Sequence, residues 1–141
     1  MLYYPAQFEP EADGGYSVTF RDIPEAITQG DTLEEARREA VDALITAMDF
    51  YFEDGRSVPV PSAAQAGEEL VAMPVSVATK VMLLNLMVEQ RKRPVELARA
   101  MHIKPQEVTR IMNVRHATKI DTLAAAFAAL GKRLEVQVLA P

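Results

Sequence analysis

The chain has 141 residues, 49% of them hydrophobic and 25% charged, which is the composition of a soluble globular protein with one ordinary domain or two small ones. It contains no cysteine, which excludes disulfides, thiolate metal sites and cysteine nucleophiles. No apolar run approaches the roughly 20 residues of a membrane span, and the N-terminal residues lack the features of a signal peptide. We therefore expect a cytoplasmic protein without a membrane partner.

The two halves of the chain differ in charge. Residues 1–74 contain four basic and fifteen acidic side chains, a formal net charge of −11, whereas residues 75–141 contain eleven basic and five acidic ones, a net charge of +6. Opposite charges of this size suggest two different partners, although acidic surfaces also serve simply to keep proteins soluble. We place a domain boundary near Pro74, with one domain at 1–74 and a second at 75–141.

The first domain is predicted to be α+β, with a small antiparallel sheet and one helix. Apolar and polar side chains alternate on both sides of Asp13-Gly14-Gly15, which is the pattern of a hairpin. Strands are expected at 2–8, 16–21, 26–29 and 70–73. Thr32-Leu33-Glu34-Glu35 is a capping box, and apolar residues at helical spacing continue from it to Gly55. Residues 58–61 contain two prolines and should be extended. Because so small a domain lies near the lower size limit for a stable core, we expect a partner or an oligomer to stabilise it.

The second domain is predicted to be all-α as far as residue 131. Pro94 and Pro105 stand at first-turn positions, and Ser76 and Thr118 are candidate caps of two further helices. Helices are expected at 76–90, 95–101 and 106–113, and a fourth from the Thr118 capping box to residue 131. Leu134, Val136 and Val138 then alternate with polar residues and predict a short strand. It has no local partner, so we expect it to pair with the same strand of a second chain in a homo-oligomer, a dimer or larger.

Residues 96–113 resemble the helix-turn-helix of the phage repressor (Cro/C1-like) family. Apolar side chains stand where the two helices of that motif pack together, and Ala98 is small where they approach most closely. The apolar positions are Leu97, Met101, Val108 and Ile111, and Ile103 fills the turn. His102 replaces the family's usual turn glycine, and histidine tolerates the left-handed conformation better than most residues. The alternative is an ordinary helical hairpin.

This resemblance implies binding to double-stranded operator DNA. On the outward face of the second helix, Gln and Asn can pair with adenine and Arg with guanine, while flanking cations can contact phosphates. The candidate DNA-binding residues are Lys104, Gln106, Glu107, Thr109, Arg110, Asn113, Arg115, His116 and Lys119. Dimerisation through the terminal strand would place two such helices on two half-sites.

Residues 2–62 resemble the HicB antitoxin family. The matching segments are Asp13-Gly14-Gly15-Tyr16, Asp22-Ile23-Pro24-Glu25, Thr28-Gln29-Gly30-Asp31-Thr32, Glu35-Ala36 and Pro59-Val60-Pro61-Ser62. Pro24-Glu25 stands where the family often has Pro-Gly. The resemblance implies a partial ribonuclease-H-like fold without the ribonuclease's catalytic carboxylates. It also implies a partner, a small basic HicA-type toxin that cleaves mRNA, and a half with a net charge of −11 is suited to masking such a protein.

Taken together, these features predict a non-enzymatic antitoxin that neutralises a HicA-type toxin by binding it and represses its own operon by binding the operator, without cofactor or metal. The alternative is a stand-alone helix-turn-helix repressor whose N-terminal domain senses a small ligand. A metal-dependent nuclease is a weaker alternative. Its candidate carboxylates, Glu9, Glu11, Asp13 and Asp22, fall mostly in loops and lack a histidine among them.

Overall fold

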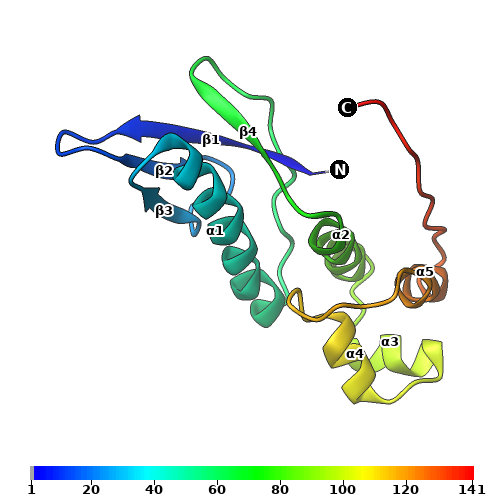
Figure 1. Ribbon diagram of the computed structural model, residues 1–141. Helices are drawn as coiled ribbons and strands as arrows, with labels where there is room; N and C mark the ends of the chain where they lie inside the picture. Colours follow the sequence, from blue (N-terminus) through cyan, green and yellow to red (C-terminus); the bar gives the residue numbers. More distant parts are fainter. Residues whose placement is uncertain (1) are drawn as a thin grey trace.

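The computed structural model describes residues 2–141, and it contains a small sheet covered by one helix and followed by four further helices (Figure 1). The strands β1 (Tyr3–Pro10), β2 (Tyr16–Phe20), β3 (Ile27–Gly30) and β4 (Glu68–Ala72) form an antiparallel sheet in the order β3-β2-β1-β4. The helices are α1 (Leu33–Asp54), α2 (Val75–Glu89), α3 (Pro94–Met101), α4 (Pro105–Ile111) and α5 (Ile120–Ala129). None of these helices has the length and apolar character needed to cross a membrane. The predicted combination of a small antiparallel sheet with helices is confirmed.

The hairpin of β1 and β2 forms around the predicted glycines. Pro10 pairs with Tyr16, and the turn between them has Gly14 and Gly15 at φ values of 95° and 82°, a region that favours glycine. Alternate residues of the strands are buried against α1 because successive strand side chains point to opposite faces. The buried strand residues of this core are Tyr4, Ala6, Val18, Phe20 and Val71.

The start of α1 follows the predicted capping box with one change of partner. The Glu35 N–H donates to Thr32 Oγ1 over 3.1 Å, but the Glu35 carboxylate accepts from the N–H of Asp31, at 3.3 Å, instead of that of Thr32. Gly30 has a packing role, since a Cβ there would lie 2.5 Å from the backbone nitrogen of Ala36. The helix ends at Gly55, which has the left-handed conformation expected of a C-cap.

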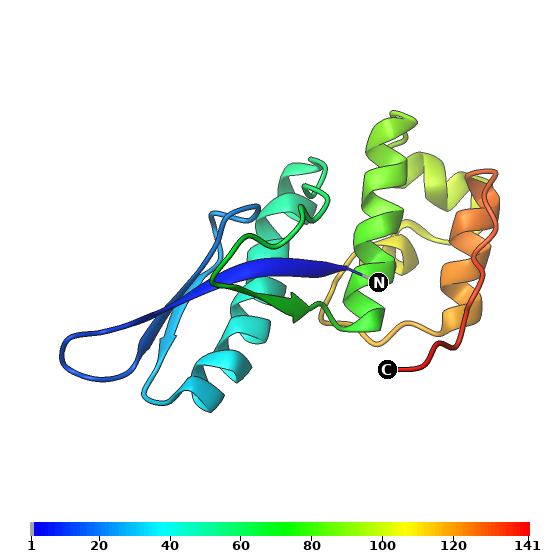
Figure 2. The same ribbon diagram turned by 90° about the horizontal axis from the view of Figure 1, so that it is seen from above.

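α2 contributes to both cores of the molecule and stands between the sheet and the last three helices (Figure 2). Its Val77 and Val81 are buried with the sheet and α1, while Leu83 and Met87 are buried with α3, α4 and α5. Asn85 donates to the carbonyl of Val58 at 3.0 Å and accepts from its N–H at 2.8 Å. The core of the N-terminal half is therefore larger than residues 1–74 alone provide.

Two predicted helix caps are wrong. α2 begins directly after Pro74, whose fixed backbone geometry sets the start, so Ser76 lies inside the helix and caps nothing. α5 begins at Ile120 with Lys119 at its N-cap and no side-chain cap, so Thr118 stands one residue too early to cap it, and its hydroxyl lies 3.3 Å from Nδ1 of His116. The edge strand predicted at 70–73 exists but covers Glu68–Ala72. α4 ends at Ile111, two residues before the end predicted for it at residue 113.

The segment after Gly131 has no regular secondary structure in this single chain, and it runs past α5 (Figures 1 and 2). Leu134 is half-buried against the second core, whereas Val136 and Val138 are 71% and 93% exposed. A strand forms only where its backbone pairs with a neighbour. The strand predicted at 134–138 is therefore not formed by one chain, and its pairing with a second chain stays a prediction.

Candidate functional site

The most distinctive local geometry lies where α3 turns into α4. Pro94 and Pro105 each occupy the first turn of a helix, as predicted, and three residues separate the two helices. His102 has φ 57° and ψ 41°, the left-handed conformation inferred for it from the sequence. Because of this turn, the N–H of Ile103 reaches back to the carbonyl of Ala98 at 3.1 Å, which closes the end of α3.

A compact apolar core fixes the angle between α3 and α4. Of the predicted packing residues, Leu97, Ala98, Val108 and Ile111 are at most 3% exposed, and Met101 and Ile103 pack against them half-buried. Leu83 and Met87 of α2, with Leu123, Ala126 and Phe127 of α5, complete this core. Since the inner face of α4 is held by three neighbouring helices, its outer face is presented in a defined orientation.

All nine predicted DNA-binding residues are exposed. They lie on the outer face of α4, at the residue before it and along the segment that joins it to α5: Lys104, Gln106, Glu107, Thr109, Arg110, Asn113, Arg115, His116 and Lys119. Glu107 is the one carboxylate among them, so the set carries net positive charge. A face with this mixture of amides and guanidinium groups can donate to phosphates and to base edges.

Several of these side chains already have partners in the molecule. Asn113 Oδ1 accepts from the N–H of Arg115 at 3.0 Å and so shapes the turn after α4. The Thr109 hydroxyl donates to the carbonyl of Pro105 at 3.2 Å. Arg115 crosses to α1, where its guanidinium lies 3.2 Å from Thr46 Oγ1 and 3.4 Å from Asp49 Oδ2. The expected role of Arg115 as a simple phosphate contact is incomplete, because the fold gives it a carboxylate partner 66 residues away.

Sequence reasoning missed Lys80, which holds this region in place. Its side chain is 1% exposed on α2, and its ammonium donates to the carbonyls of His116, Asn113 and Arg110 at 2.7, 2.8 and 3.3 Å. Burial lowers the pKa of this ammonium from its ordinary value. The cation caps the end of α4, where helix carbonyls concentrate negative potential. The sequence signal for its burial was a single lysine among the mostly apolar residues from Val77 to Leu84.

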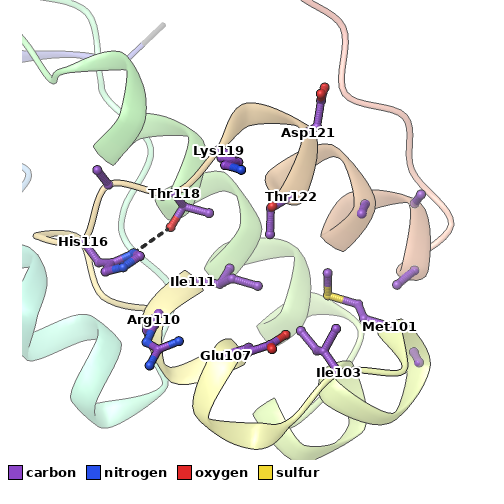
Figure 3. A pocket seen from close by; sticks show the side chains of 15 residues that line it. Met101, Ile103, Glu107, Arg110, Ile111, His116, Thr118, Lys119, Asp121 and Thr122 are labelled. Atoms are coloured by element: carbon purple, nitrogen blue, oxygen red, sulfur yellow. Dashed lines mark hydrogen bonds between the residues drawn. The ribbon is translucent and has the colours of Figure 1, made fainter.

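An open groove of about 780 Å³ runs between the turn before α4 and helix α5 (Figure 3). One side is apolar, formed by Met101 and Ile103 with the alanines of α5. Arg110, His116 and Lys119 also line the groove, together with the carboxylates of Glu107 and Asp121. The groove therefore has charges of both signs beside its apolar wall.

The carboxylates considered for a nuclease are not gathered into one site. Asp22 accepts from the backbone N–H of Ser62 at 2.8 Å and from its hydroxyl at 2.9 Å, which fastens the segment before β4. Glu9 lies at the end of β1, and Glu11 and Asp13 lie exposed in the hairpin turn. Within residues 2–141 no three carboxylate or imidazole groups are placed to share a metal ion.

Comparison with known proteins identifies the family. Residues 3–82, which contain the sheet, α1 and the first half of α2, match the model of the HicB-like antitoxins of bacterial toxin–antitoxin systems. The chain belongs to the HicB-like antitoxin family. The matched range extends beyond residue 74 into α2, in agreement with the burial of that helix in the N-terminal core.

Full-length relatives of this HicB-like chain extend the likeness to its C-terminal half. Antitoxin HicB 2 of Photorhabdus laumondii is 53% identical over 135 residues, which cover 96% of this chain and 95% of the relative. Antitoxin HicB 1 of the same organism is 50% identical over 137 residues, 97% of this chain and 87% of the relative. Antitoxin HicB of Escherichia coli K12 is 48% identical over 135 residues, 96% and 98% of the two chains. Membership in a toxin–antitoxin pair implies a toxin partner for this chain.

Proposed function

We propose that this HicB-like chain neutralises a HicA-type mRNA-cleaving toxin by binding it through the acidic N-terminal half. The observation that carries the proposal is the family match over residues 3–82, which coincides with the half whose net charge is −11. Masking needs only a complementary surface and no bond-breaking groups. The scattered carboxylates of the hairpin and the structural role of Asp22 favour binding over catalysis by this half.

We further propose that the helices α3 and α4 act as a helix-turn-helix that binds operator DNA in the chain's own promoter. The left-handed turn at His102, the buried contact between the helices and the exposed cationic face of α4 support this role. α4 would enter a major groove, where Gln106 and Arg110 contact base edges and Asn113, just after the helix, donates from its amide nitrogen while its Oδ1 accepts from the Arg115 N–H. Two copies joined through Leu134, Val136 and Val138 would read two half-sites.

One experiment tests both activities with the full chain. The small protein encoded next to it is assayed for RNA cleavage while the chain is added in increments, and binding to a DNA fragment of the shared promoter is measured in parallel. We expect cleavage to stop near equimolar addition and the fragment to be bound with an affinity that falls steeply with salt. Undiminished cleavage contradicts the antitoxin role, and equal affinity for unrelated DNA contradicts the operator role.

The alternative of a ligand-sensing N-terminal half finds only open hollows in that half. One hollow of about 520 Å³ lies between the start of β1, residues 61–64 and Leu70. Two smaller ones beside α1 have volumes of about 260 and 210 Å³. The first has the volume of a small-molecule site, but such sites usually enclose most of their ligand, and these three hollows lie open on the surface.

A further inference from the structure

One face of α1 carries a row of carboxylates. They recur at intervals of three, four or seven residues, so they lie above one another on a single side of the helix. The members of this acidic stripe are Glu35, Glu39, Asp42, Asp49 and Glu53. After Arg38, α1 has no basic side chain, so its last four turns present negative charge alone.

The opposite edge of the sheet, formed by β4, differs from the acidic stripe because its carboxylates are paired with arginines. On β4, Glu68 pairs with Arg21 at 2.7 Å and Glu69 pairs with Arg37 at 2.8 Å. Within residues 2–141, Glu39, Asp42 and Glu53 of the stripe form no such ion pair. Apart from Glu9, Glu11 and Asp13 around the hairpin turn, which also form no ion pair within residues 2–141, the uncompensated negative charge of the N-terminal half therefore lies beside β3 and away from β4.

Apolar side chains adjoin the stripe. Phe50 and Ile27 are 52% and 69% exposed, and both line a groove of about 260 Å³ between α1 and β3, together with Glu39 and Asp42. β3 is the last strand on its side of the sheet, so its outer backbone groups have no strand partner. An exposed aromatic centre with a charged rim is the arrangement on which protein partners dock.

We propose that this surface, formed by the acidic stripe, Phe50, Ile27 and the outer edge of β3, is the docking site of the toxin, which meets it with a basic face. This proposal rests on the proposed function and adds the place on the antitoxin where the toxin binds. Charge complementarity selects a basic protein, because a nucleic acid or an anionic lipid surface would be repelled by the same carboxylates. The groove then receives an apolar side chain of the toxin beside Phe50.

The test uses the full chain, the toxin encoded next to it, and matched pairs of variants. Glu39→Gln with Asp42→Asn removes two charges from the stripe, and Glu11→Gln with Asp13→Asn removes the same two charges from the hairpin turn. We expect the stripe variant to raise the toxin Kd about tenfold, mainly through slower association and less so at high salt, and the turn variant to change it less than twofold.

Phe50→Ala tests the apolar centre against Leu70→Ala, a substitution of a comparably exposed residue on the opposite edge strand. We expect a rise of tenfold or more in Kd for the first and little change for the second. Hydrogen exchange of the unaltered chain provides a second measurement, since toxin binding should slow exchange in β3 and α1 more than in β4.

The possible outcomes separate the two proposals. If the unaltered chain does not bind the toxin, the proposed antitoxin function fails. If it binds, but the stripe and turn variants are equivalent and exchange slows at β4 instead, the docking site is wrong while the function stands.

Discussion

Replacing Lys80 by methionine removes a buried ammonium while keeping a side chain of similar length and apolar character. Three carbonyl oxygens lose a charged donor, but the losses are unequal. The Asn113 carbonyl retains the N–H of His116 at 3.0 Å, and the Arg110 carbonyl retains the N–H of Asn113 at 3.1 Å. The His116 carbonyl, which accepts from Lys80 at the shortest distance, retains no such backbone donor among residues 2–141.

These contacts set the expected magnitude. A hydrogen bond to a charged group contributes about 1.5–3 kcal/mol, and part of that is offset because the variant no longer has to bury an ammonium. We expect Lys80→Met to lower the free energy of unfolding by about 1–3 kcal/mol. With a urea dependence of roughly 2 kcal/mol per molar, the midpoint should fall by about 0.5–1.5 M. Lys92→Met, at an exposed lysine, is the control and should leave the midpoint nearly unchanged.

A chemical rescue separates the charge from the packing. Because the chain has no cysteine, Lys80→Cys introduces a single thiol, which can be alkylated in the unfolded state with an aminoethyl or a propyl group before refolding. The aminoethyl product restores the ammonium and should recover both the urea midpoint and operator affinity, whereas the propyl product should recover neither. Equal recovery by both products would refute the capping role of the cation.

Four further predictions concern other residues. Arg110→Ala should weaken operator binding by about 1–3 kcal/mol and relax specificity at one base pair, as a binding curve on point-mutated operators would record. A chain ending at Gly131 should sediment as a smaller species than the whole chain, and an identical mass would contradict the dimerising strand. His102→Gly should raise the free energy of unfolding by up to about 1 kcal/mol in urea melts and His102→Val should lower it, because the left-handed conformation strains a β-branched residue. The hydrogen bond from Arg21 lowers the pKa of Glu68 from 4.5, so the pair contributes stability that is lost as pH falls below that value. Glu68→Gln should therefore reduce the fall in melting temperature between neutral and acidic pH.

Local patterns predicted the elements well where the relevant physics is local. The hairpin around Gly14 and Gly15, the cap at Thr32 and the left-handed turn at His102 each depend on a few neighbouring residues, and all three formed as expected. The caps proposed at Ser76 and Thr118 failed because the N-cap positions of α2 and α5 are Pro74 and Lys119, so neither hydroxyl stands where it could cap.

The parts that the sequence did not reveal depend on contacts between distant segments. The apolar neighbours of Lys80 could have indicated its burial but not its role, because its acceptors are backbone carbonyls 30 to 36 residues away, which have no side-chain signature. Arg115 was assigned from its neighbours alone, and its partners lie on α1. The sharing of α2 between two cores was likewise hidden, since a helix buried on several faces has no clear polar side.

The contact between Arg115 and Asp49 joins the two proposed binding surfaces through one pair of charges. Asp49 belongs to the acidic stripe, and Arg115 lies beside the helix proposed to enter DNA. A basic toxin side chain that takes Asp49 as its counter-ion leaves Arg115 available to a phosphate, and a phosphate that takes Arg115 leaves Asp49 available to the toxin. Thermodynamic linkage requires the two effects to be equal, so toxin and operator should each favour the binding of the other through this pair. An exposed ion pair of this kind limits the mutual effect to about fivefold.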